Sequence, residues 1–263
     1  MNPVSPRTLL VRGMLAGLLA GAVAFLVAYL LGEAKVDAAI AIEEAGQAAA
    51  SAHEHAADAA AAHSHGEEAP VSRALQATAG LGTGVLLYGV ALGGIAALVY
   101  CYALGRIGRF GPRATAALVT TGLFVTVTLV PFFKYPANPP AVGDPDTAAR
   151  RTALYLLMIA LSALLAAGAL ILGRRLAPKL GNWNASVVAG LGFVLLVGIS
   201  YAVLPGINEV PADFPAALIW EFRLASLAIQ TALWTTFGLA FGFLAERALV
   251  PSAAPKEALQ PAS

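Results

Sequence analysis

Six long apolar runs constrain the fold of this chain more than any other feature of its sequence. A transmembrane helix needs about 20 consecutive apolar residues. Mean hydropathy is +0.75, and only 12% of the residues are charged, against roughly 25% in soluble domains. We therefore expect one all-α integral membrane domain over residues 1–263, with the lipid bilayer as its main partner and no nucleic acid bound. The expected spans are 9–31, 78–104, 114–133, 152–172, 185–204 and 224–245.

The charges in the connecting segments set the expected orientation. Ten of the 16 Lys and Arg residues lie on one side, together with two acidic residues, whereas the other side holds six basic and thirteen acidic residues. The positive-inside rule then makes both termini cytoplasmic. We expect three hairpins with their turns outside, an extracytoplasmic arm at 32–74 and a disordered C-terminal tail at 251–263. The ten basic residues are Arg7, Arg12, Arg106, Arg109, Arg113, Arg174, Arg175, Lys179, Arg247 and Lys256.

The arm that follows the first run holds all four histidines of the chain. They form two His-x-His pairs beside Glu54 and Asp58, and the pairs are His53 with His55 and His63 with His65. Imidazole suits Co, Ni, Cu and Zn. Each pair can grip one ion only where the chain is extended, because residues i and i+2 point apart on a helix, and the Ala-rich context favours helix. We favour capture of a divalent ion such as Co²⁺, with no permanently bound cofactor, over the alternative of a low-complexity loop.

A polar stripe follows if the first helix continues into the arm. Its members recur every seven residues and would share one helix face. A solvated helix face explains such a stripe equally well, and Gly46 is a candidate break in the helix. The stripe consists of Asp37, Glu44, Ser51, Asp58 and His65.

Side chains with oxygen atoms gather at the outer ends of the odd-numbered runs, whereas the runs themselves hold no His, Asp, Glu, Lys or Arg well inside the membrane. Intramembrane charges normally mark ion pathways, so their absence moves the expected ion ligands to this outer rim or to backbone carbonyls and hydroxyls. Helix capping at the interface is the alternative role for such residues. The rim candidates are Glu43, Glu44, Asn138, Asp144, Glu209 and Asp213.

Glycine spacing predicts where helices touch. GxxxG steps let two helix backbones approach closely, and we interpret them as packing seams rather than as a permeation route. They occur at Gly13, Gly17 and Gly21, at Gly80 and Gly84, at Gly89 and Gly93, and at Gly238 and Gly242.

Catalysis is not expected. Cys101 is the one cysteine, which excludes an intrachain disulfide. No nucleophile–base pair is visible, and no phosphate-binding Gly-Lys-Ser/Thr motif occurs.

Four segments together resemble the CbtA family, the predicted cobalt-transporter subunits A of bacteria. They are Leu9–Gly21, Asp37–Glu44, the motif Lys134-Tyr-Pro-Ala-Asn-Pro-Pro-Ala-Val-Gly-Asp144, and Asn208-Glu-Val-Pro-Ala-Asp-Phe-Pro215. The resemblance covers essentially the whole chain. It implies cobalt uptake at the bacterial inner membrane, linked to cobalamin synthesis, beside a small His-bearing membrane partner, CbtB. The family is usually described with five spans, one fewer than the six counted here.

These observations together predict a membrane component of a transition-metal uptake system, with cobalt as the expected metal. The alternative function is a non-transporting scaffold or a metal-binding accessory subunit. The sequence leaves open the metal, the energy source and whether the chain forms a homo-oligomer.

Overall fold

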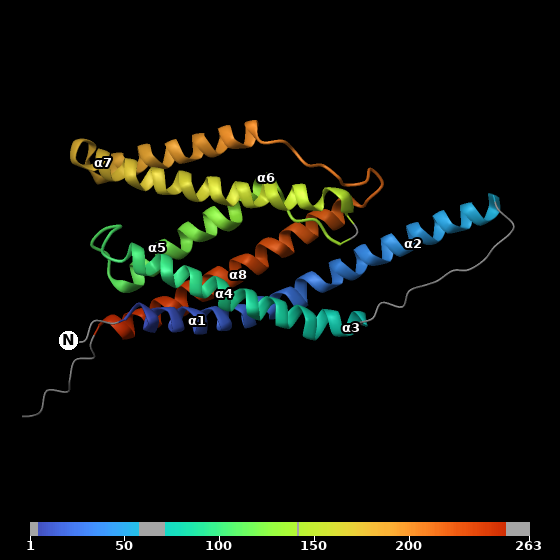
Figure 1. The fold of residues 1–263 in the computed structure, drawn as a ribbon, viewed down its shortest axis with the longest axis horizontal. Helices are drawn as coiled ribbons and strands as arrows, with labels where there is room; N and C mark the ends of the chain where they lie inside the picture. The colour runs from blue at the N-terminus through green and yellow to red at the C-terminus, as the bar shows by residue number, and fades with distance from the viewer. Residues whose placement is uncertain (1–4, 58–71, 141, 251–263) are drawn as a thin grey trace, which may run out of the picture.

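A computed structural model describes residues 5–57, 72–140 and 142–250, and all regular structure in these segments is helical. The chain runs through long helices joined by several short turns (Figure 1). In order, the elements are α1 (Pro6–Val27), the π-helical turn η1 (Ala28–Gly32), α2 (Glu33–Ala57), α3 (Arg73–Leu75), the π-helical turn η2 (Gln76–Gly80), α4 (Leu81–Ala103), α5 (Pro112–Leu123), the π-helical turn η3 (Phe124–Leu129), α6 (Val130–Lys134), the 3₁₀ turn η4 (Pro145–Thr147), α7 (Ala148–Val203) and α8 (Ala216–Leu249).

Five helices in the described residues are long and apolar enough to cross a membrane: 6–48, 73–103, 112–134, 148–203 and 216–249. All six expected spans are helical in the structure, apart from their terminal residues Leu104 and Leu204. The count differs from six because the fourth and fifth spans are joined within α7. The tail expected at 251–263 lies outside the described residues.

The helix α7 is nevertheless bent back on itself. Gly181 has φ 75° and ψ 160°, a left-handed backbone that glycine adopts readily, and it interrupts the helical geometry. Beyond it the ribbon doubles back (Figure 1). A Cβ atom built on Gly173 would lie 3.4 Å from the Ala189 Cβ, so the two sides of the bend touch. We call 148–180 the first arm and 182–203 the second arm of α7.

The first helix runs unbroken through α1, η1 and α2 as far as Ala57. Gly46 lies inside α2 and does not end it. The helical backbone therefore keeps Asp37, Glu44 and Ser51 on one face, as the stripe required. The other two members of that stripe, Asp58 and His65, lie outside the described residues.

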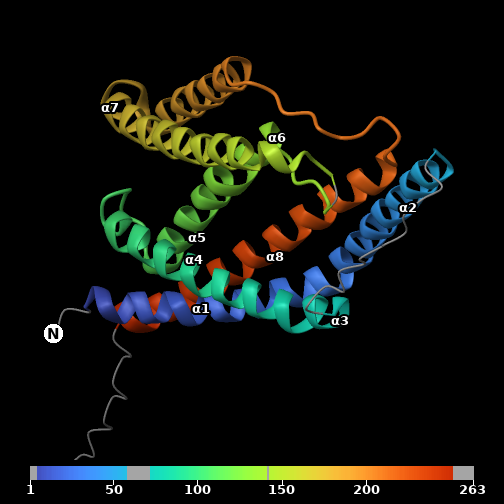
Figure 2. The same cartoon turned by 45° about the vertical axis from the view of Figure 1, so that its right-hand side comes forward.

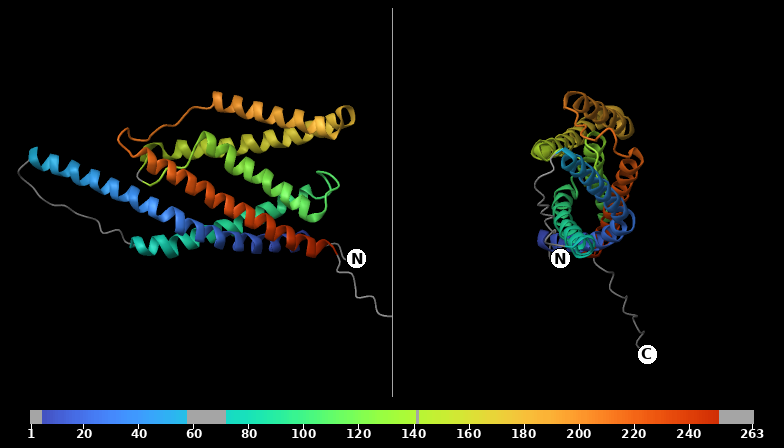
Figure 3. Two further views of the ribbon diagram at one scale, coloured as in Figure 1. Left: turned by 180° about the vertical axis from the view of Figure 1, so that it is seen from behind. Right: turned by 90° about the vertical axis from the view of Figure 1, so that its right-hand side faces the viewer.

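The helices form layers. The α1–α4 pair lies on one side and α7 on the other, with α5 and α8 between them (Figure 2). The end view shows the same order (Figure 3). The start of α1, the 104–111 loop, the bend of α7 and the end of α8 lie at one end, which we call the terminal end (Figure 1). The loops 135–147 and 204–215 lie at the other, the loop end (Figure 1).

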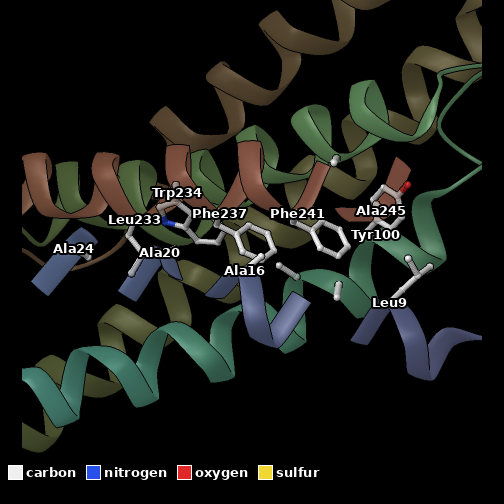
Figure 4. Close-up of a cluster of buried hydrophobic side chains, with 13 residues drawn as sticks. Leu9, Ala16, Ala20, Ala24, Tyr100, Leu233, Trp234, Phe237, Phe241 and Ala245 are labelled. Carbon is white, nitrogen blue, oxygen red and sulfur yellow. The ribbon is translucent and has the colours of Figure 1, made fainter. Parts of the chain in front are cut away.

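The largest core joins α1, α4, α5 and α8. Its centre is a line of aromatic rings on α8 and α4 (Figure 4). Phe237 and Phe241 stack with ring centroids 5.3 Å apart, and Tyr100 meets Phe241 edge-on at 5.0 Å. Small residues of α1 such as Ala16 and Ala20 face these rings and let α8 cross close to α1. A separate cluster holds α6 against both arms of α7, through Val130, Tyr135, Met158 and Val197.

Two of the glycine steps predicted as packing seams meet each other, one on α1 and one at Gly89 and Gly93 of α4. A Cβ built on Gly17 would lie 2.1 Å from the Gly89 carbonyl oxygen, and one on Gly93 would lie 2.3 Å from the Gly13 carbonyl oxygen. No side chain fits there, so the two backbones are in direct contact. Gly84 has no heavy atom within 4 Å, and the Gly80/Gly84 step therefore forms no such seam.

The seam yields a paired stability prediction on α4. The Gly89→Ala variant should be destabilised by about 1–3 kcal/mol, because its Cβ must push α1 away. Gly84→Ala should be neutral or slightly stabilising, because alanine favours helix by up to about 1 kcal/mol. Thermal unfolding of the purified protein in detergent measures both. Equal midpoints for the two variants would contradict a seam at Gly89.

Candidate functional site

A cavity of about 1190 Å³ opens at the loop end of the structure. Its walls come from α2, α6, the first arm of α7 and α8, together with residues of the loops 135–143 and 207–210. It reaches from the rim down to mid-helix positions on η3 and α8. Polar side chains are spread along its whole depth: Glu43, Thr128, Asn138, Arg151, Asn208, Arg223, Ser226 and Gln230.

The proline-rich turn after α6 is fastened to the neighbouring helices by its own polar residues. The Lys134 ammonium donates to the Tyr201 carbonyl at 2.7 Å, and the Tyr135 hydroxyl donates to the Pro205 carbonyl at 2.9 Å. Both acceptors lie at the end of the second arm of α7 or just beyond it. These bonds fix one wall of the cavity.

Arg223 fastens the same turn to α8. Its Nη2 donates to the Asn138 Oδ1 at 2.9 Å, and its Nε donates to the Ala137 carbonyl at 3.3 Å. The guanidinium therefore uses oxygen atoms that a cation would otherwise find free. Asn138 lines the cavity as the sequence predicted, and it does so with its amide oxygen engaged by Arg223.

Glu209 joins the two loops. Its carboxylate accepts a hydrogen bond from the Thr147 hydroxyl at 2.6 Å and from the Asp144 backbone N–H at 3.0 Å, and it lies 3.2 Å from Arg151 Nη1. These donors stabilise the charged form. They lower the pKa of Glu209, chiefly through the Thr147 hydrogen bond and then through the Asp144 N–H, with Arg151 and Arg150 contributing less. Its geometry is that of a clamp between the loops.

The other rim candidates are more exposed. Glu43 lines the cavity from α2. Glu44 and Asp213 are exposed, and so is Asp144, whose Oδ1 accepts a hydrogen bond from the Asp146 N–H at 2.9 Å. The structure therefore brings Glu43 and Asn138 to one cavity and places Glu209 at its edge. Within the described residues, no three His, Cys, Asp or Glu side chains come together as a metal site would require.

The His-bearing arm expected at 32–74 is described only in part. His53, Glu54 and His55 lie on the helical backbone of α2, where positions i and i+2 belong to different helix faces. Asp58, His63 and His65 lie outside the described residues. At the base of the arm, Arg73 pairs with Glu33 and with Asp37, the latter at 2.9 Å, and Lys35 pairs with Glu221 of α8. These ion pairs hold α2 beside α8 and the start of α3 beside α2.

The comparison with protein families decides the classification. Residues 6–246 match the family described as "Probable cobalt transporter subunit (CbtA)". The chain belongs to the CbtA family. No curated protein and no solved structure matches it. The description of this family is that of a subunit of a cobalt transport system, and the long apolar helices are those of a membrane protein.

The cavity of this CbtA-family chain also contains residues that the sequence did not single out as site residues. In the sequence Arg151 and Arg223 count only as charges of the connecting segments, and Ser226 and Gln230 carry no charge that would mark an ion pathway. The sequence does contain one signal for three of them. Arg223, Ser226 and Gln230 follow one another at i, i+3 and i+7, which places them on one face of α8.

The clamp predicts a pH-dependent stability. Because the folded pKa of Glu209 is lowered, its contribution is fully present above the ordinary value of 4.5 and is lost as the pH falls through the lowered pKa. Wild type should therefore melt above Glu209→Gln at pH 7, and the gap should shrink below pH 4.5. Thr147→Val, which removes the main donor, should reproduce part of the loss. Thermal midpoints from pH 3 to 8 measure this, and parallel pH profiles for wild type and Glu209→Gln would refute the clamp.

Proposed function

We propose that this chain is the membrane component of a cobalt-uptake system, taking a hydrated divalent cation from outside the cell at the loop end. The polar cavity of about 1190 Å³ carries the proposal, because it offers Glu43 and neutral oxygen atoms at the rim and continues between the helices. Membership of a family of transporter subunits supports it. Co²⁺ is the cargo in this proposal and no resident cofactor is required.

The topology belongs to the same proposal. We infer six crossings of the bacterial inner membrane, with both termini cytoplasmic. A straight helix as long as α7, at 56 residues, would measure about 84 Å at 1.5 Å per residue, against a hydrocarbon core of about 30 Å. The Gly181 bend supports two crossings instead of one. The positive-inside rule supports a cytoplasmic terminal end, because most basic residues lie in segments there.

Capture and passage are separate tasks in this scheme. The arm residues His53, His55, His63 and His65, with Glu54 and Asp58, would raise the local concentration of the ion through weak, exchangeable contacts. Glu43, Glu44, Asn138, Asp144, Glu209 and Asp213 would form the rim that the ion meets next. Glu43 is the strongest member, since it lines the cavity and carries a negative charge. Weak oxygen ligands suit a step from which the ion must leave again.

A second candidate function has its own supporting observation. Arg151 and Arg223 line the cavity near its mouth and would repel a cation. That arrangement favours an accessory or scaffold subunit that holds a partner, with the path in another chain. A small His-bearing membrane subunit of the CbtB type is the partner we propose in either case, and a homo-oligomer is compatible with both.

The topology is tested with reporter fusions. Reporters placed after Ser263, and inserted at Gly181, should both be active only in the cytoplasm, because six crossings return the chain to the starting side. A reporter after Ser64 should be active only outside. A C-terminal reporter that works outside the cytoplasm would leave the five-span description standing and end the six-span proposal.

Measurements of cobalt uptake distinguish the role of the histidines in the 32–74 arm from the role of the rim residues. Replacing all four histidines by Ala should reduce ⁵⁷Co²⁺ uptake several-fold at scarce metal and little at abundant metal, because capture only raises local concentration. The difference should fade below about pH 6.5, where imidazole protonates and no longer ligates. Glu43→Gln should instead lower uptake at every concentration. Wild-type uptake by both variants, at equal protein levels, would remove both sites from the mechanism.

The scaffold alternative is tested by comparing this chain alone, the chain with its proposed partner, and the partner alone. Proteoliposomes containing this chain alone, and then with the small His-bearing partner, should accumulate ⁵⁷Co²⁺ if the chain forms the path. Uptake that persists with the partner alone would assign the path to the partner and make this chain the accessory subunit.

A further inference from the structure

A second cavity lies along α8, as the first does, but nearer the terminal end. It measures about 450 Å³ and lies between α5 and α8. Its lining is rich in hydroxyl groups and small residues, including Thr120, Thr121, Thr235 and Gly238. Arg113 stands at its far end, where its guanidinium is neutralised by Glu246 at 2.6 Å.

The two cavities follow one another along the seam between α8 and α5–η3–α6. On α8, Phe222, Ser226 and Gln230 line the first cavity, and Trp234, Gly238 and Gly242 continue the row at steps of four residues and line the second. With 3.6 residues per turn, such a row turns by about 40° at each step, so it winds around α8 between the two cavities. The opposite wall descends in parallel. It runs from Phe132 and Thr128 beside the first cavity to Phe124, Thr121, Ala117 and Arg113 beside the second.

One hydrogen bond lies where the cavities meet. Trp234 lines the second cavity and Thr128 the first, and the indole Nε1 donates to the Thr128 Oγ1 at 3.0 Å. Both residues are buried, with 2% and 5% exposed. Figure 4 shows Trp234 in line with Phe237 and Phe241. The wall opposite Trp234 is the π-helical turn η3, a geometry that often marks functional positions.

Unpaired oxygen atoms lie on both sides of this bond. In the described part of the chain, two buried side-chain polar atoms have no hydrogen-bond partner, Gln230 Oε1 and Thr120 Oγ1. Gln230 lines the first cavity and Thr120 the second. Leaving such an atom unpaired in the protein interior is costly, so water or a hydrated ligand in the adjoining cavity is the natural partner. Amide and hydroxyl oxygens can accept from the water shell of a cation or replace part of it.

Buried hydroxyl groups gather on the elements that form one side of this seam. In the described part of the chain the buried polar side chains are Thr115, Thr120, Thr126, Thr128 and Ser162, of which Thr128 lines the first cavity and Thr120 the second. Four of these five lie on α5 and η3. Ser162 reaches the seam from α7, where its hydroxyl donates to the Thr126 carbonyl.

We propose that the seam between α8 and α5–η3–α6 is the transmembrane path of the hydrated divalent cation, and that the Trp234–Thr128 hydrogen bond closes it in the state described. Gln230 and Thr120 are the oxygen atoms on either side of the closure. The proposal rests on the proposed function for the identity of its cargo. The ion would pass only after the indole and the η3 turn separate.

Cysteine labelling tests the path without relying on cobalt. In a Cys101→Ala background, Ser226→Cys places a thiol in the first cavity and Thr235→Cys one in the second. A charged, membrane-impermeant thiol reagent added at the loop end should modify Ser226→Cys but not Thr235→Cys. Added at the terminal end, it should modify Thr235→Cys. Leu195→Cys, on the exposed face of the second arm of α7, should stay unmodified from both sides.

Breaking the closure should connect the cavities. Trp234→Phe keeps a ring but removes the donor, and Thr128→Val keeps the shape but removes the acceptor. Each should raise labelling of Thr235→Cys from the loop end by roughly tenfold, since a buried hydrogen bond biases an opening equilibrium by about that factor. Combining the two changes should raise the labelling little beyond either single variant, because both remove the same hydrogen bond.

The outcomes are separable. A Ser226→Cys thiol that is unreactive from the loop end, or Thr235→Cys labelling from there that is the same with and without the closure, would overturn the path. Cobalt uptake by the wild-type chain with either result would place the passage elsewhere and leave the proposed function standing. The expected labelling without cobalt uptake would confirm the path and remove cobalt as its cargo.

Discussion

The backbone contact between α1 and α4 is the interaction on which the rest of the structure depends. Gly13 and Gly17 meet Gly89 and Gly93 with no room for a side chain, so the two helix backbones are in direct contact. In lipid, helices gain little from apolar burial against each other, and such close packing supplies the association instead. The aromatic row of α8 then lies across this pair, and α5 packs on α8.

Distance from that contact explains the difference between the two halves of the molecule. The bundle around α1 has a continuous core, whereas α7 meets the rest mainly through α6 and η3. Loop hydrogen bonds from Lys134, Tyr135 and Glu209 supplement the thin packing of α7 at the loop end. The large cavity lies between these two halves, where the packing of α8 against α7 is incomplete.

A feature could be predicted from the sequence where it depends on local properties of the chain, and could not where it depends on tertiary contacts. Span positions depend on apolar length alone, and all six runs proved to be helical. The GxxxG steps that contain Gly17 and Gly89 were identified from their spacing. Gly84 has the same spacing, yet a Cβ built on it meets no heavy atom within 4 Å, because which face of α4 meets α1 depends on the tertiary fold. The sequence left open whether the first helix continues through Gly46, and it did not predict that the fourth and fifth spans are joined within α7. In both places one glycine permits either a helix or a bend, and the neighbouring elements decide.

The rim shows the same limit for chemistry. Glu43 and Asn138 were identified from their place beside apolar runs, and both line the cavity. The partners were not predictable. Arg223 occupies the Asn138 oxygen and Thr147 occupies Glu209 because loops distant in sequence are brought together by folding. Arginine at these positions has a structural role that the sequence shows only as a charge.

The absence of charged residues well inside the spans is consistent with the proposed ion path between α8 and α5–η3–α6. A fixed carboxylate in a low-dielectric interior would hold a divalent cation strongly and slow its release. Hydroxyl and amide oxygens bind more weakly and can exchange with the water shell of the ion. A path of such groups can keep the ion moving only if something else concentrates it and selects its sign. Under the proposed path that task would fall to the charged mouth, where Glu43 lines the cavity while Arg151 and Arg223 are held by Glu209 and Asn138. The arginines fasten the loops, and under the same proposal their positive charge at the mouth would also set how strongly the rim must attract an ion before it enters.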